Sequence, residues 1–387
     1  MKKKICVLTT SRADYGLLKP LVIGLKKEKK FQTIFTVTGT HFVKNYGYSV
    51  KEILKDKIKI DKKIIIDLIN KTSSDNISFL AGEYMKYFSK FLSENKPDYI
   101  ILLGDRYEVL SAALTSYIMS IPIIHIAGGE VTTGSYDDGF RHSITKLSDI
   151  HFVTTKQHRK RVIQLGENPK TVFNVGSLGL INLKNIKYLK KKDIEKKLKT
   201  KLLKRNIILT FHPETRNNIN IEALKSLFMV MNLMDDLKVI ITSPNLDKGR
   251  DEIMREILIN KNKFPEKNIY VPNLGSQLYY SLAKISDGVV GNSSSGISEI
   301  PSLNVGTLNI GLRQSGRPIA DSVIDLKKVS YKSLKINLHR LLSKKFKDKI
   351  ITSTNPFYQK NTDKNIISLI KKIIMSKRIN YKKFYDL

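Results

Sequence analysis

The segment from residue 98 to residue 148 constrains the fold of this chain more than any other. Two short apolar runs, 99–103 and 121–126, each end abruptly in glycine and polar residues, and the residues between them, 109–119, have helical spacing. Continuous apolar runs of this length are typical of parallel strands that are covered on both faces. The segment therefore predicts strand, helix and strand of a parallel sheet, in which ligands gather at the carboxyl ends of the strands.

The same alternation continues along all 387 residues, a comfortable length for two domains. In the first half we expect strands at 4–9, 31–38, 64–69, 99–103, 121–126, 150–154 and 172–175. In the second half we expect them at 207–210, 238–242, 269–271, 288–290 and 305–310, the last of the series. Between the halves, residues 180–205 change in composition to lysine with leucine and isoleucine, which favours a helical linker.

These elements predict an α/β protein with two doubly wound, Rossmann-like domains that face each other across a cleft. We expect the N-terminal domain to span residues 1–180 and the C-terminal domain to span residues 181–362. The remaining residues, 363–387, include a basic amphipathic helix, which we expect to pack back on the N-terminal domain.

The net charge of +33 raises the question of a nucleic-acid partner. The lysines alternate with isoleucine, leucine and asparagine, as on solvated helix faces, and the chain has no zinc-finger, helix-turn-helix or RNP-like motif. We therefore expect no nucleic-acid partner. No run is long enough to span a bilayer, so no integral membrane segment is expected. Cys6 is the single cysteine, which excludes a disulfide framework and favours a cytoplasmic location.

Charged and imidazole side chains gather at the predicted strand ends of the first half. Asp105 and Arg106 follow one strand, and Glu130 follows the next. Each residue has an alternative role as a helix cap or a surface charge, but such a concentration at adjacent strand ends favours a site. Arg12, at the first turn from strand to helix, suits a phosphate group. Further candidates in this half are His41, Asp137, Asp138 and His142.

In the second half, residues 291–296 read GNSSSG and form a predicted turn from strand to helix. The amides and hydroxyls of Ser293, Ser294, Ser295 and Gly296 suit a phosphate or diphosphate, although a single serine N-cap is the simpler alternative. Glu299 would repel phosphate, so a ribose hydroxyl is its better partner. The other candidates, all near strand ends, are His212, Ser243, Asn273 and Arg313.

Two common kinds of cofactor site lack their sequence patterns. The chain has no HxxxH, CxxC or EF-hand spacing, so a catalytic metal is not expected. The dinucleotide fingerprint GxGxxG is absent after the first predicted strand, which argues against NAD. We therefore expect no cofactor.

Taken together, the motifs resemble the hydrolysing UDP-N-acetylglucosamine 2-epimerases of bacterial sialic-acid biosynthesis. In the first half they are SRADYG (11–16), TGTH (38–41), LGDRYE (103–108), HIAGGE (125–130), RHSITK (141–146) and RVIQLGE (161–167). In the second half they are FHPET (211–215), GNSSSG (291–296) and NIG (309–311). The resemblance covers almost the full chain with its motifs in order.

The resemblance implies a fold like that of the two-domain nucleotide-sugar transferases, termed GT-B, with the site in the cleft between the domains. It implies a small-molecule UDP-sugar substrate, capsule polysaccharide synthesis and a homo-oligomer, either a dimer or a tetramer. The implied reaction converts UDP-N-acetylglucosamine and water to N-acetylmannosamine and UDP through a 2-acetamidoglucal. Asp105, Glu130 and Asp137 match the proton-transfer positions, and His212 matches a histidine near the diphosphate or sugar. Residues that match the UDP-binding set are Arg12, Ser293, Ser294, Glu299 and Arg313.

Three alternatives stay open at this point. The same reaction could use UDP-2,4-diacetamido-2,4,6-trideoxyglucose, because Ala127 stands where some relatives have an acidic residue and leaves room for a larger sugar. A glycosyltransferase of the same architecture would need an acceptor, and a sugar-nucleotide sensor would leave its ligand unchanged. The sequence does not decide which carboxylate is the base and which is the acid.

Overall fold

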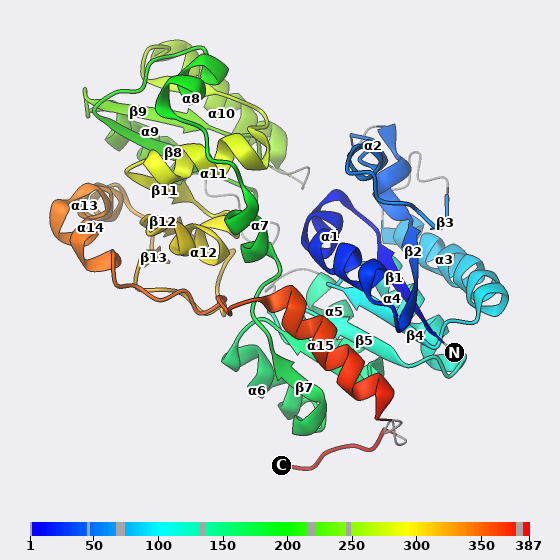
Figure 1. Ribbon diagram of the computed structural model, residues 1–387. Helices are drawn as coiled ribbons and strands as arrows, with labels where there is room; N and C mark the ends of the chain where they lie inside the picture. Colours follow the sequence, from blue (N-terminus) through cyan, green and yellow to red (C-terminus); the bar gives the residue numbers. More distant parts are fainter. Residues whose placement is uncertain are drawn as a thin grey trace. The chain divides into compact units, whose positions relative to one another are not determined.

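The computed structural model describes residues 2–44, 47–66, 74–131, 136–214, 221–244, 249–376 and 382–387, with the backbone alone described for 74–76 (Figure 1). The chain divides into two compact units. Unit 1 comprises residues 1–130, 136–182 and 359–387, and unit 2 comprises residues 131–135 and 183–358. Each unit is built on its own parallel sheet.

The sheet of unit 1 has seven described strands in the order β3-β2-β1-β4-β5-β6-β7, all parallel. Its strands are β1 (Lys3–Thr9), β2 (Phe31–Val37), β3 (Lys62–Lys63), β4 (Tyr99–Leu103), β5 (Ile123–Ile126), β6 (Ile150–Val153) and β7 (Val172–Asn174). Its helices are α1 (Arg12–Lys27), α2 (Val50–Lys55), α3 (Ser74–Asn95), α4 (Tyr107–Ile118), α5 (Tyr136–Leu147), α6 (Lys156–Gln164) and α15 (Thr362–Met375), with a 3-10 turn, η1, at Gly39–Phe42.

The central strands of unit 1 are mostly apolar and buried, as expected where helices cover both faces of a parallel sheet. Along β1, Ile5 and Val7 join one core cluster, which includes residues of α1 and α15. The alternate residues Cys6 and Leu8 join a second cluster, which includes residues of α3 and α4. This period of two distributes a continuous apolar run between two cores. The C-terminal helix α15 thus packs in the core of unit 1, although most of that unit is formed by the first half of the chain.

The sheet of unit 2 has six described strands in the order β10-β9-β8-β11-β12-β13, also parallel. Its strands are β8 (Arg205–Thr210), β9 (Leu237–Ile241), β10 (Asn268–Tyr270), β11 (Gly288–Gly291), β12 (Thr307–Ile310) and β13 (Val323–Leu326). Its helices are α8 (Lys191–Leu198), α9 (Ile221–Asn232), α10 (Arg250–Lys263), α11 (Gly275–Ile285), α12 (Ser295–Ser298), α13 (Tyr331–Leu342) and α14 (Lys344–Ile350). The structure also describes helix α7 (Gly179–Asn185) and the 3-10 turns η3 (Pro169–Thr171) and η4 (Ile300–Leu303).

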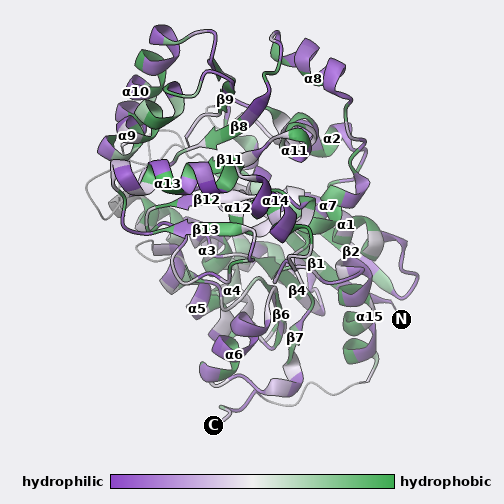
Figure 2. Ribbon diagram, turned by 90° about the vertical axis from the view of Figure 1, so that its left-hand side faces the viewer, coloured by the Kyte–Doolittle hydropathy of each residue, from purple (hydrophilic) through white to green (hydrophobic). Residues whose placement is uncertain are grey.

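Figure 2 shows helices such as α9, α10 and α13 with purple and green bands, as expected where one face of a helix is apolar and the other polar. The predicted α/β fold with two doubly wound domains is confirmed by the two strand orders. Within the described part of the chain, no helix is long and apolar enough to cross a membrane.

Three predicted elements differ from the structure. Strand β12 is not the last strand, because β13 pairs with it in parallel; the aspartate within the short run Val323–Leu326 hides this strand from a search for apolar runs. Residues 180–205 are not a simple linker, because Ile194 and Leu198 of α8 lie in the core of unit 2. A third strand predicted at 64–69 is instead the two-residue β3, and residues 67–69 lie outside the described residues.

Candidate active site

The loops that follow β4 and β5 carry the first group of site residues. The two strands pair in parallel with Leu103 opposite Ile126, so their carboxyl ends lie side by side. The amide of Gly104 donates to the carbonyl of Ile126 (3.1 Å), which ties the start of one loop to the other strand. Asp105 and Glu130 are thereby brought to one edge of the sheet, as the spacing of the motifs predicts.

Helix α5 brings a second set of side chains to this edge. Arg141 is buried, and its guanidinium donates through Nη1 to the carbonyl of Ala127 (2.9 Å) and through Nη2 to Asp105 Oδ2. The same Nη1 lies 4.0 Å from Glu130 Oε2. Arg141 was missed as a site residue by the sequence analysis, although it stands one helical turn after Asp137, on the same face of the helix.

Asp105 has the electrostatics of a group that exchanges protons near neutral pH. Burial raises the pKa of Asp105 to about 6, Arg141 opposes the rise, and the nearby carboxylates of Asp137, Glu130 and Asp14 add to it. Glu130 accepts a hydrogen bond from Thr154 Oγ1 (3.0 Å) through Oε1. The structure therefore brings three of the predicted catalytic acids, Asp105, Glu130 and Asp137, into one electrostatic cluster.

His142 and Asp138 stand on the next face of α5. His142 Nε2 lies 3.7 Å from Asp138 Oδ2, and partial burial lowers the pKa of His142 despite this neighbour. His142 Nδ1 is buried without a hydrogen-bond partner among the described residues. The pair has the spacing of residues i and i+4, so both side chains share one side of the helix.

The other candidates of unit 1 occupy different settings. Arg106 makes a bidentate pair with the fully buried Glu108, at 2.9 Å and 3.1 Å. Arg12 begins α1, where it is half exposed and paired with Glu52 (2.7 Å). His41 is fully buried, with hydrogen bonds to Thr9 Oγ1 (3.0 Å) and Ser49 Oγ (2.9 Å), and burial lowers its pKa to about 4. Neutral His41 therefore holds the loop after β2 against β1.

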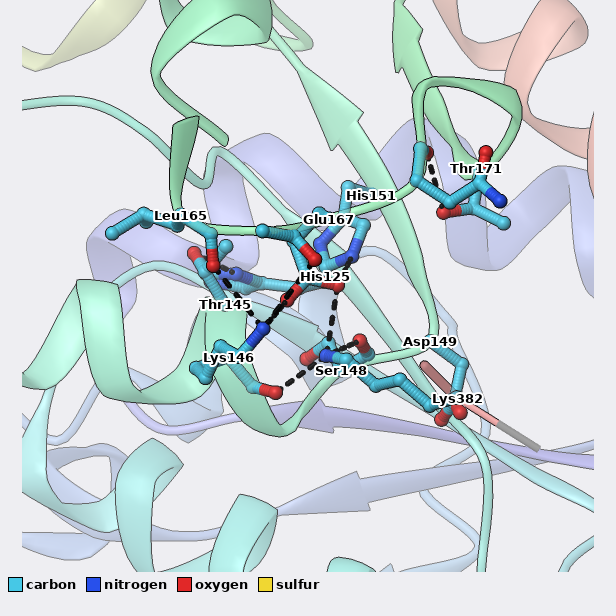
Figure 3. Close-up of polar contacts among 12 residues, drawn as sticks. His125, Thr145, Lys146, Ser148, Asp149, His151, Leu165, Glu167, Thr171 and Lys382 are labelled. Carbon is cyan, nitrogen blue, oxygen red and sulfur yellow. Dashed lines mark hydrogen bonds and ion pairs between the residues drawn. The ribbon is translucent and has the colours of Figure 1, made fainter. Parts of the chain in front are cut away.

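A buried polar network connects α5 to the sheet, and Figure 3 shows two of its members, His125 and Thr145. His125 of β5 contacts Thr145 Oγ1 (3.1 Å) and the carbonyl of Gly104 (2.9 Å), and Thr145 in turn donates to the carbonyl of Arg141 (2.9 Å). A Cβ atom at Gly128 would lie 2.8 Å from Thr145 Oγ1, so only glycine allows the helix to approach this closely. The network fixes α5 relative to the ends of β4 and β5.

The C-terminal segment anchors the far end of α5. Lys382 Nζ pairs with Glu167 Oε2 (2.8 Å) and donates to the carbonyls of Ser148 (2.6 Å) and Lys146, as Figure 3 shows. Glu167 also accepts from buried His151 (3.0 Å). Burial lowers the pKa of Lys382, and hydrogen bonds to His151 and Lys382 outweigh burial and lower the pKa of Glu167.

In unit 2, Asn292 connects two loops at the carboxyl edge of the sheet. Its side chain accepts from the amide of His212 (2.6 Å) and donates to the carbonyl of the same residue (2.8 Å). The carbonyl of Asn292 accepts from Gln314 Nε2 (2.8 Å) and lies 3.5 Å from Arg313 Nη1. Glu214 Oε1 accepts from the amide of Arg313 (3.2 Å). The side chain of Asn292 thus holds the backbone of His212, and the carbonyl of Asn292 together with Glu214 contacts Arg313.

The GNSSSG turn follows β11. Gly291 has φ +128°, and a Cβ atom there would lie 1.9 Å from the carbonyl oxygen of Thr210, so the turn requires glycine. Ser294 is exposed and Ser293 partly exposed, whereas Ser295 bonds to Tyr279 (2.7 Å). The remaining candidates of unit 2 contact nearby side chains and amides. The amide of Gly296 donates to the carbonyl of Ser293, and Glu299 accepts a hydrogen bond from Ser298 (2.5 Å). Ser243 is hydrogen-bonded to Tyr270 (2.5 Å), and the side chain of Asn273 accepts from the amide of Gly275 (2.8 Å).

The two edges differ in the chemistry they support. Unit 1 offers carboxylates, one of them with a raised pKa, which suits transfer of protons. Unit 2 offers hydroxyls and backbone amides at a glycine-rich turn with an arginine nearby, which suits an anion. Within the described residues, no group of three or more histidine, cysteine or acidic side chains is arranged to hold a metal ion.

Comparison with known proteins places the chain in one family. The family model described as UDP-N-acetylglucosamine 2-epimerase matches residues 24–371. The chain is 38% identical to the polysialic acid biosynthesis protein P7 of Escherichia coli over 390 residues, covering 100% of this chain and 98% of that protein. It is 39% identical to the GDP/UDP-N,N'-diacetylbacillosamine 2-epimerase (hydrolyzing) of Campylobacter jejuni, covering 100% of both. A crystal structure of UDP-GlcNAc 2-epimerase from Neisseria meningitidis, bound to UDP-GlcNAc, shares the fold with a TM-score of 0.73 at 18% identity, covering 95% of this chain and 100% of that one.

Proposed function

The chain belongs to the UDP-N-acetylglucosamine 2-epimerase family, and from this premise we propose that it is a hydrolysing 2-epimerase. The proposed reaction converts UDP-N-acetylglucosamine and water to N-acetylmannosamine and UDP, as a step toward sialic acid. The observation that carries the proposal is the cluster of Asp105, Glu130 and Asp137, in which burial and neighbouring charges raise the pKa of Asp105 to about 6.

The first half of the reaction is an elimination. A carboxylate of the cluster takes the proton from C2 of the sugar, the C2 electron pair forms a double bond to C1, and the C1–oxygen bond to the diphosphate breaks. A C2–H bond is weakly acidic, so the base must be held in contact with it, and a raised pKa makes a carboxylate a stronger base at neutral pH. The products of this half are 2-acetamidoglucal and UDP.

The second half is a hydration of the glycal. Water adds its oxygen to C1 and gives up a proton, while C2 receives a proton on the face opposite to the one that lost it. This inversion at C2 needs a second acidic group, and the cluster of three carboxyl groups supplies candidates for both roles. The net result is N-acetylmannosamine, with no change in oxidation state.

Residues of unit 2 would hold the nucleotide. The GNSSSG turn and Arg313 offer amides, hydroxyls and a cation, which stabilise the negative charge on the departing diphosphate. His212 is the candidate that contacts the diphosphate or sugar, and Asn292 fixes its backbone on both sides.

A second substrate is favoured by one comparison. The Campylobacter jejuni relative is named for N,N'-diacetylbacillosamine, a sugar with a second acetamido group, and it matches this chain over its whole length. Ala127, in the loop after β5, has a short and partly buried side chain, which suits a larger sugar better than an acidic side chain would. UDP-2,4-diacetamido-2,4,6-trideoxyglucose is therefore the alternative substrate for the same elimination and hydration.

Proton NMR of the purified protein with each UDP-sugar separately tests the proposal. We expect release of UDP together with the free 2-epimeric sugar, N-acetylmannosamine from the first substrate. Turnover of the diacetamido sugar alone would assign the alternative substrate. Absence of turnover with either sugar, in a protein that binds UDP, would contradict the proposed enzyme activity.

A further inference from the structure

Arg141 joins three parts of unit 1 through one buried side chain. Its guanidinium contacts a carboxylate after β4, a carbonyl after β5 and, at 4.0 Å, a second carboxylate after β5. The side chain is only 6% exposed. The remaining guanidinium nitrogen, Nε, has no hydrogen-bond partner among the described residues. A buried cation is costly unless it is paired, so its place here reflects the carboxylates that it faces.

An arginine fits this position in a way that a lysine does not. The planar guanidinium presents donors in fixed directions, so contact with the carbonyl of Ala127 also orients the donor that reaches Asp105. A lysine ammonium would supply a charge with no such fixed plane. The arrangement therefore couples the direction of the Asp105 carboxylate to the position of the loop after β5.

The backbone of Arg141 is itself held in place. Its carbonyl accepts from Thr145 Oγ1 (2.9 Å), and Thr145 contacts His125 of β5 (3.1 Å). His125 also bonds to the carbonyl of Gly104, the residue before Asp105. The guanidinium thus extends from a helix that is fixed to both strand ends, which limits how far it can move.

We propose that Arg141 is the positioning residue of the acid cluster: it fixes the orientation of the Asp105 carboxylate and faces the carboxylate of Glu130. This inference rests on the proposed function for its consequences in catalysis. The contact between Arg141 and Asp105 is a feature of the chain whatever the substrate.

The charges around Asp105 show why the arginine matters. From α5 it faces Arg141 and Asp137, from the loop after β5 it faces Glu130, and from α1 it faces Asp14. Arg141 is the one cation among these named neighbours. Its removal leaves Asp105 with three acidic neighbours, which raises the pKa of Asp105 further and favours its protonated form at neutral pH.

The test compares Arg141→Met, Arg141→Lys and the control Arg159→Met. Arg159 of α6 binds the carbonyls of Val172 (3.0 Å) and Pro169 (2.9 Å), so its loss removes a similar side chain away from the acids. In Arg141→Met we expect the acid limb of the kcat/KM profile to move up by about one pH unit or more. In Arg141→Lys the limb should stay near that of the wild type, while kcat falls about tenfold because the fixed fork is lost. The control Arg159→Met should keep both the acid limb and the kcat of the wild type.

A second readout does not depend on turnover. In protein labelled with ¹³C at the aspartate carboxyl, the Asp105 signal is assigned by its loss in Asp105→Asn, and its titration is compared in wild type and Arg141→Met. We expect a higher pKa in the variant. An unchanged Asp105 pKa or an unchanged acid limb in Arg141→Met would overturn the proposal, and so would full kcat in Arg141→Lys. If Arg141→Met does not fold, the kcat of Arg141→Lys decides. If the wild type turns over no UDP-sugar, the proposed function fails, and the titration still decides the role of Arg141.

Discussion

The carboxyl edges of the two sheets carry different kinds of side chain. At the edge of unit 1, ionised groups meet one another: Asp105 contacts Arg141, and the Asp105 pKa is raised to about 6. At the edge of unit 2, the amide of Asn292 holds the loop of His212, and exposed serine hydroxyls follow a glycine turn. The same fold thus supports an edge suited to moving protons and another suited to holding an anion.

This difference predicts that the two edges affect separate steps. Loss of an acid in unit 1 should slow the chemical step and leave nucleotide binding intact. Loss of a hydroxyl in unit 2 should weaken nucleotide binding and affect the chemical step less.

The largest effect is expected from Asp105→Asn and Glu130→Gln. Each substitution keeps the shape of the side chain and removes its ability to exchange a proton, so we expect kcat to fall by about 10³-fold or more. Affinity for UDP, measured by calorimetry at pH 7.5, should stay within about threefold of the wild type if the acids do not bind the nucleotide. Near-native turnover in either variant would remove that residue from the proposed chemistry.

The next largest effect is expected in the pH dependence of kcat/KM, which should report on the acids of unit 1 and not on nucleotide binding by unit 2. The Asp105 pKa is raised to about 6, so below that pH the carboxylate is protonated and kcat/KM should fall about tenfold per pH unit. Binding of UDP-N-acetylglucosamine to the inactive Asp105→Asn variant should stay flat between about pH 5 and pH 8. A flat kcat/KM profile across the same range would show that Asp105 need not be ionised.

A smaller effect is expected from the double substitution Ser293→Ala with Ser294→Ala. Removing two hydroxyls from the turn should raise KM for the UDP-sugar about tenfold or more, since each hydrogen bond contributes a net of about 0.5–1.5 kcal/mol and about 1.4 kcal/mol corresponds to a factor of ten. We expect kcat to change by less than about threefold. Ser302→Ala, which loses a bond to Asn355, is the matched control and should not change KM. A fall in kcat alone would assign the turn to the chemical step.

The smallest effect on turnover is expected from Lys382→Met. Lys382 pairs with buried Glu167 and with carbonyls at the end of α5, so its loss should lower the free energy of unfolding by about 2 kcal/mol. The control Lys383→Met changes a neighbouring exposed lysine and should be neutral. Denaturant unfolding measures both variants. Equal stability of the two would show that the C-terminal contact does not support α5.

Much of the fold could be predicted because buried parallel strands have continuous apolar sequences. Strand β4, with five buried residues, is visible in the sequence within its true bounds. Strand β13 is not, because Asp325 interrupts its short run and is stabilised there by the amide of Asn309 (2.7 Å). The long lysine-rich segment looked like a linker because the sequence shows charge but not which helix face is turned to the core.

The placement of the candidate acids at one edge of the sheet could be predicted for a related reason. Asp105 and Glu130 lie in the loops after β4 and β5, and the pairing of these strands brings the loops side by side. The role of Arg141, which lies within a helix, depends on a contact with a residue 36 positions earlier, which no local pattern contains. Asn292 directly follows β11, but its contact with His212 is likewise absent from any local pattern. The role of Asn292 depends on a loop 80 residues earlier in the chain.

The most direct test of the account is turnover in heavy water. If an acid cluster removes the C2 proton of the sugar, proton NMR should show N-acetylmannosamine, or its diacetamido counterpart, carrying deuterium at C2, with UDP released in equal amount. A product that keeps its original hydrogen at C2 would contradict the account, because no elimination through that carbon would then have occurred.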